Sequence, residues 1–409
     1  MENGTMAGRK ASKRGGRWTA RVVDVFLPLA LALGLAACAH KPPPDTEPVE
    51  APLAYYWQSA EGHLRLLAAA RPVKDWLADE GAPEQLKTRL LLAQRLRDFA
   101  SQALALPENA SYTRYADLNR PAALWNLVAA PPLSLQLRTW CHPVTGCIGY
   151  QGWFDEARAR EAAARLAARG LDVAVYPVPA YSTLGWSNWL GGDPLLNTFV
   201  QGGEVELARL LFHELAHQLI YLKDDTAFNE SFATAVERLG LARWLADAGD
   251  ERLRQTYAEA EQRREAFRMI KREARARLAV VYAQPGLSDA DRLSRKAQVL
   301  AQLRHAYWQL RALWGVDPAR VLPADRWVEE ASNASLGAEG AYDQWVPAFE
   351  ALFAREVGAG SDWRPFYDAV RRLAALPAPA RQEALQALLR PGSRSGPRTA
   401  AWLLPVSGP

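Results

Sequence analysis

The stretch LLFHELAHQLIYLKDDTAFNESFATAVE, residues 210–237, constrains this chain more than any other part of it. Its first half is mostly apolar and predicts a helix, which puts His213 and His217 one turn apart on the same face. Two imidazoles at that spacing can bind one ion, and zinc–nitrogen bonds of about 2.0–2.1 Å are compatible with it. Glu214 points about 100° away round the helix. The stretch therefore predicts a metal site with a carboxylate beside it.

Glu214 has a position that a simple binding site does not need. A carboxylate next to a metal ion can take a proton from the attacking water and deliver it to the leaving amine. We therefore expect Glu214 to act as the general base of a hydrolytic enzyme. Catalytic zinc takes three protein ligands and leaves the fourth position open, so one further ligand must follow the histidines.

Three downstream groups compete for that third position. Asp224 and Asp225 fall where the first helix should end, so turn and capping roles suit them better. Glu230 lies 13 residues after His217, which allows one helix to end and a second to return after a short turn. By spacing alone, Glu237, two turns further on, copies the thermolysin-like arrangement. Both glutamates are therefore candidates at this point.

The N-terminus has the features of a secretory signal. Basic residues run to Arg21, the apolar run VFLPLALALGLAA follows, and the segment ends at LAAC with Cys38. The apolar run is too short for an ordinary spanning helix. The LAAC ending looks like the lipobox of bacterial lipoproteins, in which the cysteine is acylated and becomes the mature N-terminus. We predict a signal peptide over residues 1–37 and lipidation of Cys38; the alternative is cleavage after Ala37 with an unmodified cysteine.

The predicted lipid anchor leads to a prediction of where the protein lies and how its chain is divided. Under the sorting rule of bacterial lipoproteins, Ala39 suggests the outer membrane, with the folded part facing the periplasm. Residues 38–52 are rich in proline and predict an extended tether. Residues 53–390 are predicted to form the metallopeptidase domain, and residues 391–409, rich in Gly, Pro and Ser, a flexible tail.

The charge distribution excludes one class of partner. The net charge of +4 is due to residues 1–37, because the rest of the chain carries 43 basic and 43 acidic residues. A nucleic-acid-binding protein normally has a basic patch on its folded part, and the sequence has none. The predicted partners are a peptide substrate and the membrane, and the oligomeric state is left open.

Apolar spacing of three and four predicts helices, and aromatic and β-branched residues in the middle of the chain predict a small β-sheet just before the HELAH helix. We therefore expect a mostly helical α+β domain. Helices are expected over residues 53–106, 155–169 and 250–282, and strands over 147–154, 171–178 and 180–186. Residues 250–282 are dense in charge, which suits a solvated amphipathic helix better than a coiled-coil partner site.

Cys141 and Cys147, in WCHPVTGC, form an even pair in an exported chain. Pro143 and Gly146 let the short segment between them turn back. We predict a disulfide, which would contribute about 2 kcal/mol by the chain-entropy model. The alternative is a metal site in which both cysteines act with His142.

The order HELAHQ followed by FNESFA resembles the M1-type aminopeptidases, which are gluzincins. That resemblance implies one zinc ion per chain on His213, His217 and Glu230, with Glu214 as the general base. It leaves Glu237 to orient a ligand histidine. The spacing departs from that family, since twelve residues separate His217 from Glu230 here and eighteen do so there.

A second resemblance covers nearly the whole mature chain. Segments such as YYWQSAEGHLRLL, YADLNRPAALWNLVAAPPLSL, VPAYSTLGW and NASLGAEGAYDQWVPAFEALF look like the bacterial predicted-aminopeptidase lipoprotein family. Together the two resemblances imply a zincin-like metallopeptidase.

The resemblance to M1-type enzymes also implies a substrate-binding edge. AYSTLGW ends some 27 residues before His213, close to where those enzymes place a strand that pairs with extended substrate. The expected edge residues are Ser182, Thr183, Leu184, Gly185 and Trp186, with glycine allowing close backbone approach. The glutamate that binds the free amine in those enzymes has no counterpart here; Asp193 is nearby but also suits a turn before Pro194.

Hydrolysis also needs a donor to the oxyanion. M1-type enzymes use a tyrosine downstream of the glutamate ligand, which implies Tyr342; Asn333, Tyr181 and Tyr221 are alternatives. The sequence thus predicts a zinc peptidase, an aminopeptidase in the first place. The alternatives are a zinc endopeptidase acting on envelope proteins and a catalytically silent, lipid-anchored binding protein.

Overall fold

The computed structural model describes residues 46–47, 49, 52–142, 146–184, 188–358 and 360–390. The chain divides into two compact units, Met1–Thr46 and Glu47–Pro409, and nearly all described residues belong to the second. The predicted signal peptide, Cys38, the C-terminal tail, Gly185 and Trp186 lie outside the described residues. So does the side chain of Tyr342.

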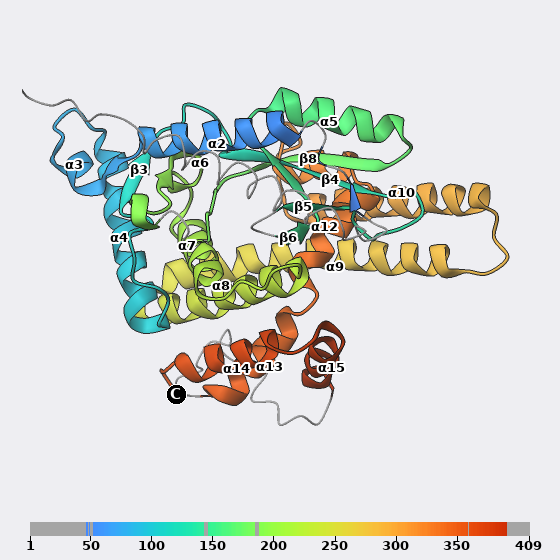
Figure 1. Ribbon diagram of the computed structural model, residues 1–409. Helices are drawn as coiled ribbons and strands as arrows, with labels where there is room; N and C mark the ends of the chain where they lie inside the picture. Colours follow the sequence, from blue (N-terminus) through green and yellow to red (C-terminus); the bar gives the residue numbers. More distant parts are fainter. Residues whose placement is uncertain are drawn as a thin grey trace, which may run out of the picture. The chain divides into compact units, whose positions relative to one another are not determined.

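The second unit is mostly helical with small mixed sheets, which confirms the predicted α+β class (Figure 1). The three predicted helical regions are confirmed, the first as three separate helices. The helices are α2 (Pro52–Ala69), α3 (Val73–Ala78), α4 (Glu84–Leu104), α5 (Glu156–Ala168), α6 (Asn197–Val200), α7 (Glu204–Leu219), α8 (Thr226–Ala248), α9 (Glu251–Ala283), α10 (Asp289–Leu313), α11 (Pro323–Glu329), α12 (Asn333–Asp343), α13 (Val346–Glu356), α14 (Arg364–Ala374) and α15 (Ala378–Leu388).

Short strands accompany these helices. They are β1 (Thr46–Glu47), β2 (Arg71–Pro72), β3 (Arg114–Ala116), β4 (Leu124–Ala130), β5 (Thr139–His142), β6 (Gly146–Ile148), β7 (Gln151–Trp153), β8 (Asp172–Val178) and β9 (Leu195–Leu196). One sheet has the order β7-β4-β8, and both neighbours are antiparallel to β4. A second has the order β2-β3-β9.

Strand β4 is buried along its whole length, because helices cover both faces of its sheet. On one face Leu127 and Ala129 pack with Ala159 and Leu166 of α5. On the other, Val128 and Ala130 pack with residues of α12. Figure 1 shows α5 above β4 and β8, and α12 below them. A strand buried on both faces has no polar alternation, so the sequence did not predict it.

The predicted disulfide between Cys141 and Cys147 is confirmed. The two cysteines face each other across the antiparallel pair β5 and β6. The bond therefore closes the hairpin that precedes β7, and neither cysteine is available to a metal.

The strand predicted for AYSTLGW is wrong over its described part, residues 180–184, which belong to no strand. Leu184 has a φ of +56°, a left-handed conformation that an extended strand excludes. The backbone N–H of Thr183 donates to Asp193 Oδ2 over 3.0 Å, and its hydroxyl donates to Oδ1 over 2.7 Å. The carboxylate of Asp193 thus accepts from the Thr183 N–H, which a sheet edge would have offered to a substrate.

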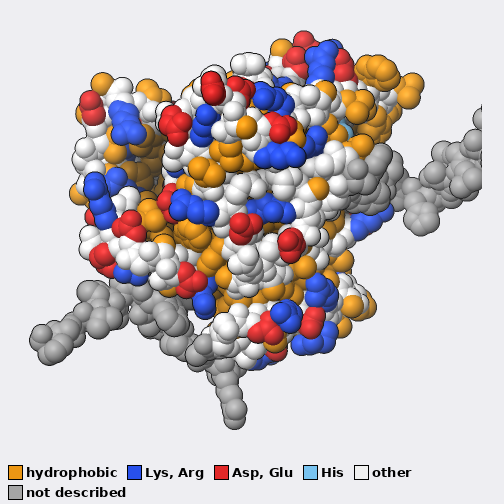
Figure 2. All heavy atoms as spheres, turned by 90° about the vertical axis from the view of Figure 1, so that its left-hand side faces the viewer, with side chains coloured by type: hydrophobic (Ala, Val, Ile, Leu, Met, Phe, Trp, Pro, Cys, Tyr) orange, Lys and Arg blue, Asp and Glu red, His pale blue; other side chains and the backbone are white. Residues whose placement is uncertain are grey.

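The main core lies around α7 and α8, whose apolar faces pack against each other and against α4, α13 and α14. Helix α9 packs against α10 of the same chain, through Ala274 and Leu278 on one side and Val299 and Leu303 on the other. Figure 2 shows a face on which basic and acidic side chains are interspersed among apolar patches. Within the described part of the chain, no helix is long and apolar enough to cross a membrane.

Candidate metal centre

Helix α7 carries HELAH and is held by its apolar face. Glu204 and Glu206 occupy its first turn, where negative charge suits the positive end of the helix. Leu211 and Leu215 are fully buried in the main core. His213 and His217 lie on another side of the same helix, where they contact Glu230 and Glu237 of α8.

Asn229 closes the turn between the two helices. Its side chain accepts a hydrogen bond from the backbone N–H of Leu222 and donates one to the carbonyl of the same residue, each over 2.7 Å. Asp225 caps α8 by accepting from the N–H of Phe228 over 3.0 Å, as expected of a capping residue. The position of Glu230, one residue after Asn229, is therefore fixed by the turn itself.

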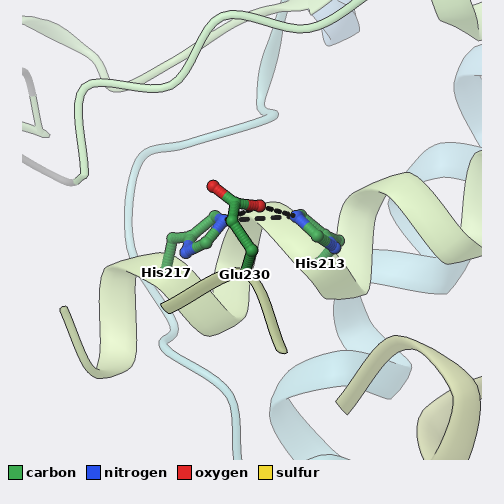
Figure 3. A group of neighbouring side chains, drawn as sticks. All are labelled: His213, His217 and Glu230. Atoms are coloured by element: carbon green, nitrogen blue, oxygen red, sulfur yellow. Dashed lines mark hydrogen bonds and ion pairs between the residues drawn. The ribbon is translucent and has the colours of Figure 1, made fainter. Parts of the chain in front are cut away.

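Glu230 faces both histidines (Figure 3). Its Oε2 lies 3.3 Å from His213 Nε2 and 3.6 Å from His217 Nε2, and the two Nε2 atoms are 3.2 Å apart. Figure 3 shows the carboxylate of α8 between the two imidazoles of α7. Among the described residues, His213, His217 and Glu230 form a group whose possible ligand atoms all lie within 4.8 Å of one another.

Glu237 contacts the other side of the first histidine. Its Oε2 lies 3.2 Å from His213 Nδ1, and its Oε1 is paired with Arg209 of α7. The Nδ1 of His217, by contrast, is buried and has no hydrogen-bond partner within the described residues. Glu237 therefore fixes the ring of His213 and leaves its Nε2 directed at Glu230.

The buried histidines and glutamates shift one another's pKa values. Burial opposes the protonated imidazole, but contacts with Glu230 and Glu237 raise the pKa of His213 to about 10. Burial likewise opposes ionisation of Glu230, yet the two histidines lower its pKa to about 2. Burial raises the pKa of Glu214 above its usual value, with the histidines opposing the shift.

The donor set suits a zinc ion. Two imidazole nitrogens and one carboxylate oxygen converge, which is the ligand composition of many catalytic zinc sites. A carboxylate on the far nitrogen of one ligand histidine is the usual outer support. Glu214 follows His213 in the chain, and no hydrogen bond joins its side chain to another described residue.

The disulfide hairpin is tied to the turn between α7 and α8. The N–H of Cys147 donates to Asp224 Oδ1 over 2.6 Å. Gly146 has a φ of +78°, and a Cβ atom there would collide with the Asp224 carboxylate, so only glycine fits this contact. The hairpin is therefore fixed to the turn that precedes Glu230.

A second link joins α7 to the irregular segment 180–184. Gln218, next to His217, donates to Asp193 Oδ2 over 3.3 Å and to Ser111 Oγ over 3.2 Å. The same Asp193 oxygen accepts from Ser182 Oγ over 3.4 Å. Asp193 is 1% exposed. It organises this loop from within the protein, where its carboxylate accepts hydrogen bonds from Ser182, Thr183 and Gln218.

Tyr150, between β6 and β7, was not singled out by the sequence. Burial and then the charge of Glu230, with a smaller effect of Glu214, raise the pKa of Tyr150 well above its usual value. Its hydroxyl makes no hydrogen bond to another described residue. No sequence signal marks it, because the hairpin and Glu230 are far apart in the chain and are brought together only by folding.

The other predicted donors differ in their environment. Asn333 is fully buried, and its side chain binds the carbonyls of Pro131 and Pro132 over 3.1 and 2.9 Å. Its amide is therefore committed to the fold. Tyr221 is partly buried, and the charge of Glu230 contributes to a pKa of about 12 that is due mainly to burial. Tyr181 packs against His63 and Phe154.

The fold and this group define a mostly helical α+β protein with a buried His–His–Glu cluster that could hold a metal ion. The model of a family described as "Putative aminopeptidase" matches residues 54–385. The chain belongs to this family, and membership supports a peptidase hydrolase with a peptide substrate. No match was found among curated proteins or among solved structures.

Proposed function

We propose that this protein is a zinc-dependent peptidase of the bacterial envelope that releases residues from the free amino end of peptides. The observation that carries the proposal is the convergence of His213, His217 and Glu230, beside Glu214, in a chain of an aminopeptidase family. The lipobox-like ending at Cys38 supports an anchor in the outer membrane, with the enzyme facing the periplasm.

His213, His217 and Glu230 would hold the zinc ion, which when bound supplies a Lewis acid for peptide hydrolysis. Glu214 takes the proton of the attacking water and passes it to the leaving amine. Glu237 keeps the ring of His213 oriented.

A phenol donates to the oxyanion that forms on the peptide carbonyl. Tyr342 is the candidate from the family resemblance, and Tyr150 is the candidate from its environment. A phenol is protonated at neutral pH and can donate a hydrogen bond there, and burial of Tyr150 raises its pKa further.

A second candidate function is endopeptidase action on envelope proteins. It is favoured by the environment of Asp193, the acidic residue nearest the position where M1-type enzymes bind the substrate amine. This carboxylate is buried and accepts hydrogen bonds from Ser182, Thr183 and Gln218. An enzyme with no carboxylate for a free amine would cleave within chains.

The test is digestion of two matched peptide libraries, one with free and one with acetylated amino ends, by zinc-loaded protein. Cleavage of the free library alone, from its amino end, supports the aminopeptidase. Equal cleavage of both libraries replaces it with the endopeptidase. Zinc-loaded protein that cleaves neither library would contradict peptidase activity, and protein treated with a chelator is the control.

A further inference from the structure

Helix α2 has an apolar face that no described part of the protein covers. Only two of its 18 residues, Glu61 and Arg65, are charged. The side chains of Leu53, Trp57 and Leu64 are 89, 73 and 61% exposed. A helix turns by about 100° per residue, so these three point within about 40° of one another.

The opposite face of α2 is fully used by the core. Tyr55 packs edge-on against Trp153, with ring centroids 5.2 Å apart. Gly62 lies directly against the ring of Phe154, so that a larger residue would not fit there. Leu66 is 2% exposed. The helix is therefore apolar on two opposite faces, and the protein buries one of them.

Other surface helices of the unit expose single apolar side chains, such as Met269 of α9 and Leu313 of α10, but their outward faces also carry charged residues. Helix α5 exposes Glu161 and Arg165, and α9 exposes Glu259 and Arg263. Figure 1 shows α2, in blue, along one edge of the second unit. A contiguous exposed apolar stripe on such a helix indicates an interaction surface.

The chain just before α2 is fixed to the folded unit. Glu47 is 2% exposed, with Oε1 2.9 Å from Arg138 Nε and Oε2 2.8 Å from an Nη atom of Arg169. Cys38 precedes Glu47 by nine residues, and no chain of that length reaches further than about 32 Å. An acyl anchor on Cys38 would thus hold the start of α2 close to the bilayer.

We propose that the outer face of α2 lies on the lipid surface that holds Cys38, with Leu53, Trp57 and Leu64 in the headgroup region. Tryptophan favours this region, because its ring is apolar and its N–H can remain hydrated. Helices of this kind bury their apolar face about 5–10 Å deep without spanning the bilayer. The proposal rests on the lipid anchor of the proposed function.

The acyl anchor on Cys38 favours a lipid surface over a protein as the partner of this face of α2. A short tether keeps the bilayer at high effective concentration beside α2, so weak apolar contacts suffice to hold the helix there. Contact with lipid in turn limits rotation of the enzyme about its tether.

The experiment uses the full chain, processed in bacteria and reconstituted into vesicles of phosphatidylethanolamine and phosphatidylglycerol. Cys141 and Cys147 are joined to each other, so a cysteine introduced by Leu53→Cys or Leu64→Cys is the thiol available to a spin label once Cys38 is acylated. Leu313→Cys, at the end of α10 and 84% exposed in the native protein, is the matched control. Mass spectrometry of the intact protein reports acylation.

Collision of the label with lipid-soluble oxygen and with a water-soluble nickel chelate gives its depth. We expect the labels at 53 and 64 to lie about 5–10 Å below the phosphates, and the label at 313 to lie in water. On acylated protein, labels at 53 and 64 that are as open to nickel as the control overturn the inference and leave the anchor intact. Labels shielded from both probes overturn it in favour of a protein partner, and an unmodified Cys38 overturns anchor and inference together.

Discussion

Two regions of α8 approach the same histidine from opposite sides. Glu230, in the first turns of the helix, lies 3.3 Å from His213 Nε2, and Glu237, two turns later, lies 3.2 Å from His213 Nδ1. Both glutamates are buried, 8 and 7% exposed. They differ in their other partners, since Glu237 is paired with Arg209, whereas no Lys or Arg among the described residues pairs with Glu230.

The difference bears on which glutamate can bind a metal ion. A carboxylate whose charge is balanced by a guanidinium has less to offer a cation, and it serves as a fixed hydrogen-bond acceptor. A carboxylate that faces only imidazoles keeps its charge for the ion. The ion-pair partners of the two glutamates therefore favour Glu230 as the metal ligand, whereas their spacing in the sequence favoured Glu237.

We expect the largest loss of activity from a change at Glu214, the proposed general base. Glu214→Gln removes the proton acceptor but no metal ligand, so we expect kcat/KM for peptide hydrolysis to fall by about 10²–10⁴ with the zinc content unchanged. Elemental analysis and peptide kinetics measure the two quantities. Glu206→Gln, an exposed change in the first turn of α7, is the matched control. A Glu214→Gln protein with full activity would exclude this residue as the base.

The two glutamates can be compared directly by zinc affinity. Glu230→Ala removes a proposed ligand and should weaken zinc binding more than about 100-fold, whereas Glu237→Ala removes an outer support and should weaken it about 10–100-fold. Competition with a chelator on purified protein gives both constants, and circular dichroism checks that each variant is folded. Equal losses, or a larger loss in Glu237→Ala, would reverse the choice of ligand.

A change at Arg209 tests the ion pair between Arg209 and Glu237, and its expected effect is smaller. Arg209→Met leaves the Glu237 charge without its cation, so we expect the free energy of unfolding to fall by about 1–3 kcal/mol. Zinc affinity should fall less than in Glu237→Ala, because the glutamate still contacts His213. Glu237→Gln added to Arg209→Met should restore much of the stability, since no unpaired charge remains. Denaturant titration measures these values, and a double variant no more stable than Arg209→Met would exclude the charge pair as the cause.

Patterns of neighbouring residues in the sequence predicted the helices, the strand and the cap that depend on contacts within a few residues of the chain. The apolar period of α7, the density of charge on α9 and the aromatic and β-branched content of β8 are all properties of residues close together along the chain. Asp225 was expected to cap or turn, and it caps α8. The disulfide followed from the cysteine count and the predicted export.

Parts decided by distant contacts were missed. Strand β4 has no polar alternation, because α5 and α12 cover both of its faces. The segment 180–184 is irregular, since Asp193 binds the N–H of Thr183. The charge of Glu230 raises the pKa of Tyr150, which lies in the hairpin that Asp224 holds, and no spacing in the sequence encodes that relation.

The sequence by itself determined a helix with two histidines one turn apart, a glutamate between them, and a second helix that returns with two candidate ligands. Helical period alone fixes those relations. The packing of α7 against α8 decided the rest. It placed Glu230 at Nε2 of His213 and Glu237 at Nδ1, and it paired Glu237 with Arg209. Burial makes such pairings specific, because a charged group removed from water must find its partner within the fold.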